Sequence, residues 1–310
     1  MTVKEKPVLI SVVGPTAVGK TAIGIALAQH YGAQVISADS RQFFREMSIG
    51  TAKPSAEELN MVAHHFVDSM SIYEPYNSGQ FERDVMDLLD ILFHHNRIQL
   101  MVGGSGLYCQ SVWYGMDNIP EVNEEIRLQL NQEFEKSGIE RLQQELLEND
   151  PAYFAMVDKQ NHVRLIRALE VIRSTGNKYS DYRKRSKNLV ERDFQTINIG
   201  LEMDRQQLYS RIDRRMDQMI ASGLFEEAER LFENRHLNSL QTVGYQEIFG
   251  YLEGKYSKEE SVRLLKRNSR RYAKRQLTWF KKDQTIQWFD AQNPSDGLKL
   301  IKEYIDRLLG

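Results

Sequence analysis

The sequence contains a single cysteine, Cys109, and no apolar run long enough to cross a membrane. One cysteine excludes an internal disulfide and is typical of a reducing compartment, so we expect Cys109 to be a small buried residue. The N-terminal segment MTVKEKPVLI lacks the long apolar core of a signal peptide. These absences predict a cytoplasmic protein with no membrane partner.

Metal-ligand spacing and strong net charge are also missing. The seven histidines form no metal-binding pattern, and a net charge of −2 gives no overall attraction for nucleic acid. Apolar residues make up 41% and charged residues 27%, as in ordinary globular proteins. A chain of 310 residues is long enough for one large or two modest domains. We expect it to act as a monomer.

Five apolar segments have the length and composition of buried strands, namely residues 7–13, 33–39, 97–104, 196–203 and 285–291. Helical spacing follows the first of them, through Ile23, Ala26, Leu27 and Tyr31. Strands that alternate with helices predict an α/β fold with a doubly wound parallel sheet. From 117 to 194 the segments are helical and charge-rich, which predicts an all-helical insertion domain within a core formed by 1–116 and 195–310.

The segment GPTAVGKT matches the phosphate-binding P-loop pattern and lies between an expected strand and an expected helix. Its residues are Gly14, Pro15, Thr16, Ala17, Val18, Gly19, Lys20 and Thr21. In such a loop the backbone N–H groups and the helix N-terminus surround a phosphate. Lys20 supplies a positive charge for the outer phosphate, and the Thr21 hydroxyl can ligate Mg²⁺. The motif therefore predicts binding of a di- or triphosphate together with Mg²⁺.

Asp39 ends another expected strand, in the segment VISADSRQFF, where ligands of open α/β sheets bind. Three roles are open for its carboxylate: a Mg²⁺ ligand, a cap for the following helix, or a general base that faces the leaving group. The second glycine-rich segment, VGGSGLY at 102–108, is either a tight turn or a wall of the same pocket. Ser105 is its side-chain hydroxyl before Tyr108.

Basic residues gather near the C-terminus, where nine Lys or Arg and no acidic residue lie between Arg263 and Lys282. On a helix the basic side chains share one face, opposite Leu265, Tyr272 and Trp279, which we expect to be core residues. This face consists of Arg263, Arg267, Arg270, Arg271 and Lys274. A one-sided charge pattern favours contact with the phosphate backbone of a nucleic acid over a solvated surface.

Two further groups of basic residues lie outside this face. The segment YRKRSK, Tyr182 to Lys187, adds a basic patch to the expected insertion. Arg211, Arg214 and Arg215 follow an expected core strand, so that one of them can reach the bound phosphates.

At this point the chain closely resembles the bacterial tRNA dimethylallyltransferases. The matching segments occur in order over about residues 8 to 282: GPTAVGKT, SADSRQFF, IGTAKPS, HHFVDS, VGGSGLY, RALEVIRSTGNKYS, GLFEEA, TVGYQEI and RRYAKRQLTWF. The P-loop alone is generic, whereas the ordered set is specific. The resemblance implies a P-loop NTPase-like fold that holds dimethylallyl diphosphate in place of a nucleotide.

The resemblance also implies the acceptor and the residue roles. The prenyl group would go to N6 of the adenosine on the 3′ side of the anticodon, with Asp39 as the general base. Lys20, Thr21 with Mg²⁺, and Arg215 would neutralise the departing diphosphate, and Ser105 would line the catalytic channel. The base, once out of its stack, would meet Asp39, Ser40, Arg41 and Gln42. Other contacts with the anticodon stem-loop would come from Arg127, Gln160, Asn161, His162, Val163, Arg164, Thr242, Val243, Gly244, Tyr245 and Gln246, and from Arg267 and Arg271 of the basic face.

Several positions depart from the pattern of the family. Ser105 stands where threonine is commoner and keeps the hydroxyl. Gln246 replaces a frequent basic residue, which puts a phosphate contact there in doubt. Three alternative functions stay open: a P-loop kinase of a nucleoside or small metabolite, an RNA-binding protein with a vestigial P-loop, and a prenyltransferase that acts on free adenine nucleotides.

Overall fold

The computed structural model describes residues 6–117, 119–120, 122–183 and 190–310. Contacts divide the chain into two compact units, one made of 1–113 and 192–310 and the other of 114–191. The first unit holds the sheet and the second is helical. The sequence prediction placed the corresponding boundaries at 117 and 194.

A six-stranded sheet forms the centre of the first unit, in the order β3-β2-β4-β1-β5-β6, with every neighbouring pair parallel. The strands are β1 (Val8–Val13), β2 (Val35–Ser37), β3 (His64–His65), β4 (Ile98–Gly103), β5 (Gln195–Glu202) and β6 (Ile286–Asp290). The α/β class, the parallel sheet and the five expected strands are confirmed. The edge strand β3 was missed, because two residues carry no readable pattern.

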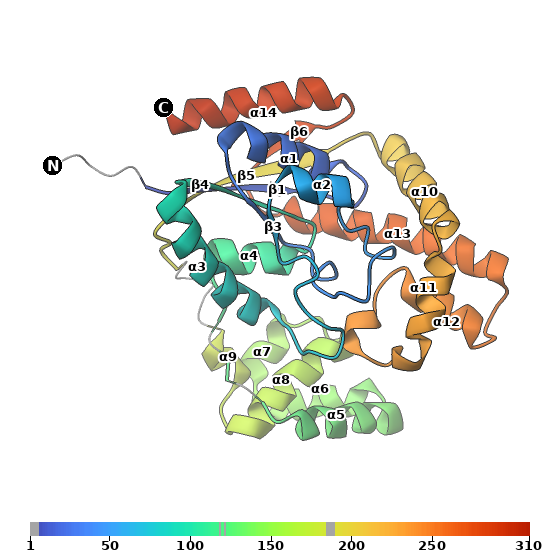
Figure 1. Ribbon diagram of the computed structural model, residues 1–310. Coiled ribbons are helices and arrows are strands. Elements are labelled where there is room, and N and C mark those ends of the chain that lie inside the picture. The colour runs from blue at the N-terminus through green and yellow to red at the C-terminus, as the bar shows by residue number, and fades with distance from the viewer. Residues whose placement is uncertain (1–5, 118, 121, 184–189) are drawn as a thin grey trace. The chain divides into compact units, whose positions relative to one another are not determined.

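Helices cover both faces of this sheet, with α1 and α14 on one face and α3 and α4 on the other (Figure 1). The helices of this unit are α1 (Lys20–Tyr31), α2 (Ala56–Met61), α3 (Ser78–His95), α4 (Gly106–Tyr114, whose last residue belongs to the other unit), α10 (Arg205–Ala221), α11 (Leu224–Leu231), α12 (Tyr245–Leu252), α13 (Lys258–Phe280) and α14 (Pro294–Leu309). Two short 3₁₀ turns, Phe232–Asn234 and Asn238–Leu240, connect α11 to α12. Burial on both faces explains why the central strands read as continuous apolar runs.

Helix α13 is long and basic, yet local signals fix where it begins. Its N-cap is Ser257, whose hydroxyl accepts the backbone N–H of Glu260. The negative charges of Glu259 and Glu260 in the first turn interact favourably with the positive end of the helix dipole. Leu265 and Phe280 are fully buried, so one side of the helix joins the core.

The helical unit contains α5 (Glu124–Ser137), α6 (Ile139–Asn149), α7 (Pro151–Met156), α8 (His162–Thr175) and α9 (Tyr179–Tyr182). It has a hydrophobic core of its own, with Leu142, Leu146 and Leu165 fully buried. The buried carboxylate of Asp150 caps α7 and accepts the N–H and hydroxyl of Ser180, which fastens α9 to the start of α7. The patch Tyr182–Lys187 falls largely outside the described residues.

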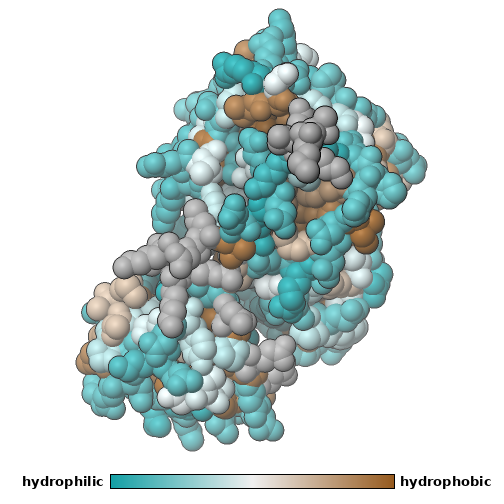
Figure 2. Space-filling view, turned by 90° about the vertical axis from the view of Figure 1, so that its left-hand side faces the viewer, coloured by the Kyte–Doolittle hydropathy of each residue, from teal (hydrophilic) through white to brown (hydrophobic). Residues whose placement is uncertain are grey.

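No helix in the described part of the chain is long and apolar enough to span a membrane. On the face drawn in Figure 2 the described surface is mostly hydrophilic, with apolar residues in small separate patches. Cys109 is fully buried as expected, and burial raises the pKa of its thiol to about 12.

Candidate active site

The P-loop joins β1 to α1 and turns through left-handed backbone positions. Gly19 has φ +111° and Ala17 has φ +65°, which turns successive N–H groups toward one side. The Lys20 ammonium donates to the carbonyl oxygen of Pro15 at 2.8 Å, so the lysine side chain lies along its own loop. The loop has the form that its sequence predicts.

Asp39 follows β2, the strand on the far side of β4 from β1. Its carboxylate accepts the backbone N–H of Arg41 at 3.1 Å, and no helix follows directly, so the carboxylate stabilises a turn. Ser105 supports this turn from the end of β4: its N–H donates to the Ala38 carbonyl at 3.2 Å, and its hydroxyl accepts the Ser40 N–H at 2.9 Å. The position of Asp39 therefore depends on Ser105.

The glycines of VGGSGLY permit close approach, and Val102 and Gly103 of this segment line the same cavity as the P-loop, as the second of the two expectations predicted. A Cβ atom on Gly103 would lie 2.2 Å from the Ala38 carbonyl oxygen. A Cβ on Gly104 would lie 2.3 Å from the side-chain nitrogen of Gln276 on α13. Any larger residue would push the turn that carries Asp39, or helix α13, away from the end of β4.

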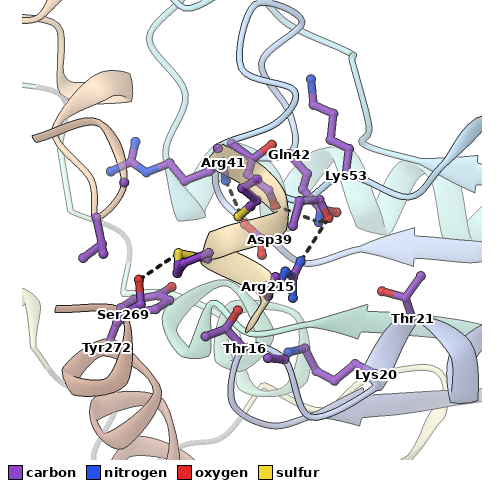
Figure 3. A pocket seen from close by; sticks show the side chains of 18 of the residues that line it. Thr16, Lys20, Thr21, Asp39, Arg41, Gln42, Lys53, Arg215, Ser269 and Tyr272 are labelled. Carbon is purple, nitrogen blue, oxygen red and sulfur yellow. Dashed lines mark hydrogen bonds between the residues drawn. The ribbon is translucent and has the colours of Figure 1, made fainter. Parts of the chain in front are cut away.

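One cavity of about 680 Å³ contains both the P-loop and Asp39. Its lining includes six basic side chains and two acidic ones: Lys20, Arg41, Lys53, Arg211, Arg214 and Arg215 against Asp39 and Glu58. Figure 3 shows Lys20, Asp39 and Arg215 directed into this space. All three predicted arginines of α10 line it. The excess of positive charge suits a polyanion such as diphosphate.

Burial changes the ionisation of these basic groups. It lowers the pKa of Lys20 to about 8, a shift that Arg215 increases and Asp39 opposes. Burial also lowers the pKa of Arg215, again against the attraction of Asp39. A buried cation loses hydration, so an incoming anion compensates it and is bound firmly.

The loop 50–54 forms another wall and is held by two site residues. The Gln42 amide accepts from the Ser37 hydroxyl at 3.0 Å and donates to the Ala52 carbonyl at 3.2 Å. Arg215 donates to the same carbonyl at 3.4 Å. Gln42 lines the cavity as predicted, although the structure uses its amide to hold the loop.

Tyr272 of α13 is a site residue that sequence reasoning missed. We expected it in the core, but it is half-buried, lines the cavity and faces the region of Asp39 (Figure 3). Burial raises the pKa of its hydroxyl to about 12, and the negative charge of Asp39 adds to this shift, so the phenol stays neutral. Its position within the basic run, between Arg271 and Lys274, gave no signal of this role.

The basic face of α13 is less uniform than its sequence indicates. Arg263 is paired with Glu260 of the same helix, and Arg270 with Asp213 of α10. Lys266 is paired with Asp217 of α10. Arg271 and Lys274 are exposed, whereas Arg267 is half-buried beside Asn268. The carboxylates of Asp213 and Asp217 come from α10, so the local sequence of α13 could not show these two ion pairs.

The segment Thr242 to Gln246 divides into cavity, core and surface. Thr242, Val243 and Gly244 line the cavity. Tyr245 is fully buried and donates to Glu227 at 2.7 Å, which differs from the predicted tRNA contact because a core side chain cannot reach RNA. Gln246 is exposed and donates to Gln241.

The predicted RNA contacts of the helical unit are partly engaged within that unit. Arg127 forms a two-bond ion pair with the buried Glu170, at 2.6 and 2.7 Å. Asn161 caps α8 by accepting the Arg164 N–H, and His162 stacks on Phe134. Gln160, Val163 and Arg164 are exposed. The structure therefore presents a surface at the start of α8, with Arg127 fixed in orientation.

A parallel α/β sheet with a P-loop, and a carboxylate that shares one basic cavity with that loop, are the features of a P-loop-type enzyme. The family model for IPP transferase matches residues 42–283. The chain belongs to the IPP transferase family.

Similar proteins cover nearly the whole chain. The tRNA dimethylallyltransferase of Cytophaga hutchinsonii is 52% identical over 281 residues, which is 91% of this chain and 92% of that protein. That of Christiangramia forsetii is 47% identical, over 96% of this chain and 97% of the relative.

Two solved structures resemble this one. The tRNA isopentenylpyrophosphate transferase of Bacillus halodurans has a TM-score of 0.71 at 38% identity, and the match covers 97% of this chain and 96% of the other. A eukaryotic dimethylallyltransferase described as acting on tRNA has a TM-score of 0.77 at 25% identity, over 93% of this chain and 75% of the other.

Proposed function

We propose that this protein transfers a dimethylallyl group from dimethylallyl diphosphate to N6 of the adenosine on the 3′ side of the anticodon in tRNA. The observation that carries the proposal is the shared cavity, in which Asp39 lies with Lys20 and Arg215. The relatives named for tRNA dimethylallyl transfer support the choice of acceptor. A P-loop kinase would account for the phosphate loop, but it would not account for the match to the IPP transferase family.

The reaction makes one bond and breaks one bond. The N6 lone pair attacks C1 of the dimethylallyl group, the C1–O bond breaks, and diphosphate leaves with the electron pair. N6 then carries an extra proton, which Asp39 accepts. Because conjugation with the purine ring makes N6 a poor nucleophile, removal of this proton as the bond forms lowers the barrier. Lys20, Arg215 and the N–H groups of the P-loop stabilise the charge on the leaving group.

The site suits a Mg²⁺ ion that is held mainly by the phosphate oxygens of the substrate. Mg²⁺ commonly takes one or two protein oxygens and completes its shell with phosphate oxygens and water. Among the described residues, no group of three or more acidic, histidine or cysteine side chains is arranged so that it could hold a metal ion. Thr21, at the first turn of α1, lines the cavity and would ligate the ion beside the diphosphate. When bound, Mg²⁺ would neutralise charge on the leaving group.

The acceptor base must leave its stack to reach Asp39. Tyr272 lines the cavity and offers an aromatic ring to an adenine. The residues that line the cavity do not include Ser40 or Ser105, whose hydroxyls bond to each other beside the turn that carries Asp39. Arg271 and Lys274 on the exposed side of α13, and Arg164 at the start of α8, would contact RNA phosphates.

The direct test is to incubate the protein with tRNA, dimethylallyl diphosphate and Mg²⁺, digest the RNA and analyse its nucleosides by mass spectrometry. The proposal expects one adenosine per tRNA to gain a dimethylallyl group and no requirement for ATP. A parallel incubation with AMP tests the alternative acceptor. Modification of AMP but not of tRNA would contradict the proposal, and so would ATP turnover without prenyl transfer.

A further inference from the structure

A single buried side-chain amide connects the P-loop to the segment that follows β4. Gln276 of α13 is 6% exposed. Its side-chain oxygen accepts the backbone N–H of Thr16 in the P-loop at 2.8 Å. Its side-chain nitrogen donates to the carbonyl oxygen of Gly104, at the end of β4, at 2.9 Å. Its amide therefore holds together two loops that follow neighbouring strands, β1 and β4.

The bond to Thr16 changes what the P-loop can offer a phosphate. Backbone N–H groups are the donors of such a loop, and each can serve only one strong acceptor at a time. With the Thr16 N–H bonded to Gln276, the diphosphate is left to the N–H groups further along the loop, toward Lys20. Gln276 thus limits where along the loop the leaving group can sit.

The hydrogen bond to Gly104 connects Gln276 to the segment that carries Asp39, the proposed general base. Gly104 is followed by Ser105, which fixes the turn after β2 through the Ala38 carbonyl and the Ser40 N–H. That turn carries Asp39. A route of hydrogen bonds therefore runs from the P-loop through Gln276 and Ser105 to the segment that holds the carboxylate.

We propose that Gln276 is a positioning residue that fixes the diphosphate cradle relative to Asp39. This inference rests on the proposed function. An amide suits the task because it donates at one end and accepts at the other, as this pair of backbone groups requires. The absence of a side chain at Gly104 leaves space for the amide to reach the carbonyl. Errors of about 1 Å in such alignment can lower rates about 100-fold.

The test replaces Gln276 by methionine, which has a similar length and volume but forms neither bond with comparable strength. Prenyl transfer to tRNA is measured per active site, with sites counted by the stoichiometry of pyrophosphate binding. We expect kcat per site to fall about 10- to 100-fold. The pyrophosphate Kd should change less than about threefold, because the remaining N–H groups and Lys20 stay in place. Thr278→Ala, on the exposed side of the same helix, is the matched control and should leave both values unchanged.

Two outcomes would overturn the inference. An unchanged kcat per site would mean that Gln276 only stabilises the fold, and an equal loss of kcat and pyrophosphate affinity would mean that it acts only through donor binding. If the methionine variant does not fold, Gln276→Asn serves instead, since its amide is one methylene too short to reach both partners. It should show the same selective loss of kcat. Failure of the proposed function would appear separately, as absence of prenyl transfer by the unmodified protein.

Discussion

The Tyr245 hydroxyl donates to the carboxylate of Glu227 at 2.7 Å, and both side chains are buried beneath a wall of the cavity. The same carboxylate accepts the backbone N–H groups of Ser48, Ile49 and Gly50, at 3.1, 2.9 and 2.9 Å. The loop continues directly into Thr51 and Ala52, which line the cavity. Glu227 and Tyr245 therefore shape the site without entering it.

Removing these two groups should have unequal effects on stability. Tyr245→Phe loses one hydrogen bond and should lower the free energy of unfolding by about 1 kcal/mol. Glu227→Ala leaves three backbone N–H groups and a buried hydroxyl without their acceptor, and should cost about 3 kcal/mol or more. Urea denaturation measures both. Tyr73→Phe at a 64% exposed position is the control, and an equal effect there would contradict the assigned role of Tyr245.

Donor binding should depend on pH through Lys20. Burial lowers the pKa of Lys20 to about 8, so above that pH the free cavity holds a neutral amine that must gain a proton when diphosphate binds. The ratio of the pyrophosphate Kd of Lys20→Met to that of the unmodified protein should be constant below pH 8. At higher pH the ratio should fall by about tenfold per pH unit.

Use of this ratio removes the ionisation of pyrophosphate itself from the comparison. Isothermal titration between pH 6.5 and 9.5, a range of roughly one and a half units on each side of the expected pKa, gives both constants. A ratio that stays constant over the whole range would show that Lys20 remains charged, and would contradict the predicted protonation on binding.

The exposed part of the basic face should govern tRNA affinity. Arg271→Glu combined with Lys274→Glu should weaken tRNA binding and reduce the slope of log K against log salt by about one for each lost phosphate contact. Donor binding should be retained, because neither side chain is among those that line the cavity. The control is Lys299→Glu combined with Lys302→Glu on α14, which makes the same change in net charge. Equal losses in the two variants would mean that only overall charge matters.

Much of the fold was predictable because it depends on local patterns. Strands β1, β2, β4 and β5 are largely buried and therefore read as apolar runs, and the P-loop requires its glycines, Lys20 and Thr21 at fixed spacing. Asp39 could be proposed because the ends of parallel strands meet at one edge of the sheet. These features need only a few neighbouring residues to be recognised.

The rest depends on contacts between distant segments. Gln276 lies 260 residues from Thr16, and although it stands in the matching segment RRYAKRQLTWF, its local sequence does not show that it contacts the P-loop. In the sequence Arg270 is surrounded by basic residues, yet in the structure it forms an ion pair with Asp213 of α10. Tyr245 lies in a segment that matches the family, but its side chain packs inward against Glu227. Each of these roles follows from tertiary packing, which local sequence does not encode.

The role of Asp39 as general base is the central claim, and Asp39→Asn tests it most directly. Asparagine can still accept the Arg41 N–H, so the turn should persist while the proton acceptor is lost. We expect kcat for prenyl transfer to fall by a factor of roughly 10² to 10⁴, with pyrophosphate affinity little changed at every Mg²⁺ concentration. Single-turnover transfer to tRNA, measured while Mg²⁺ is titrated, decides the question. A rate that stays low at saturating Mg²⁺ is the predicted result, and recovery of near-normal turnover at high Mg²⁺ would show that Asp39 holds the metal instead.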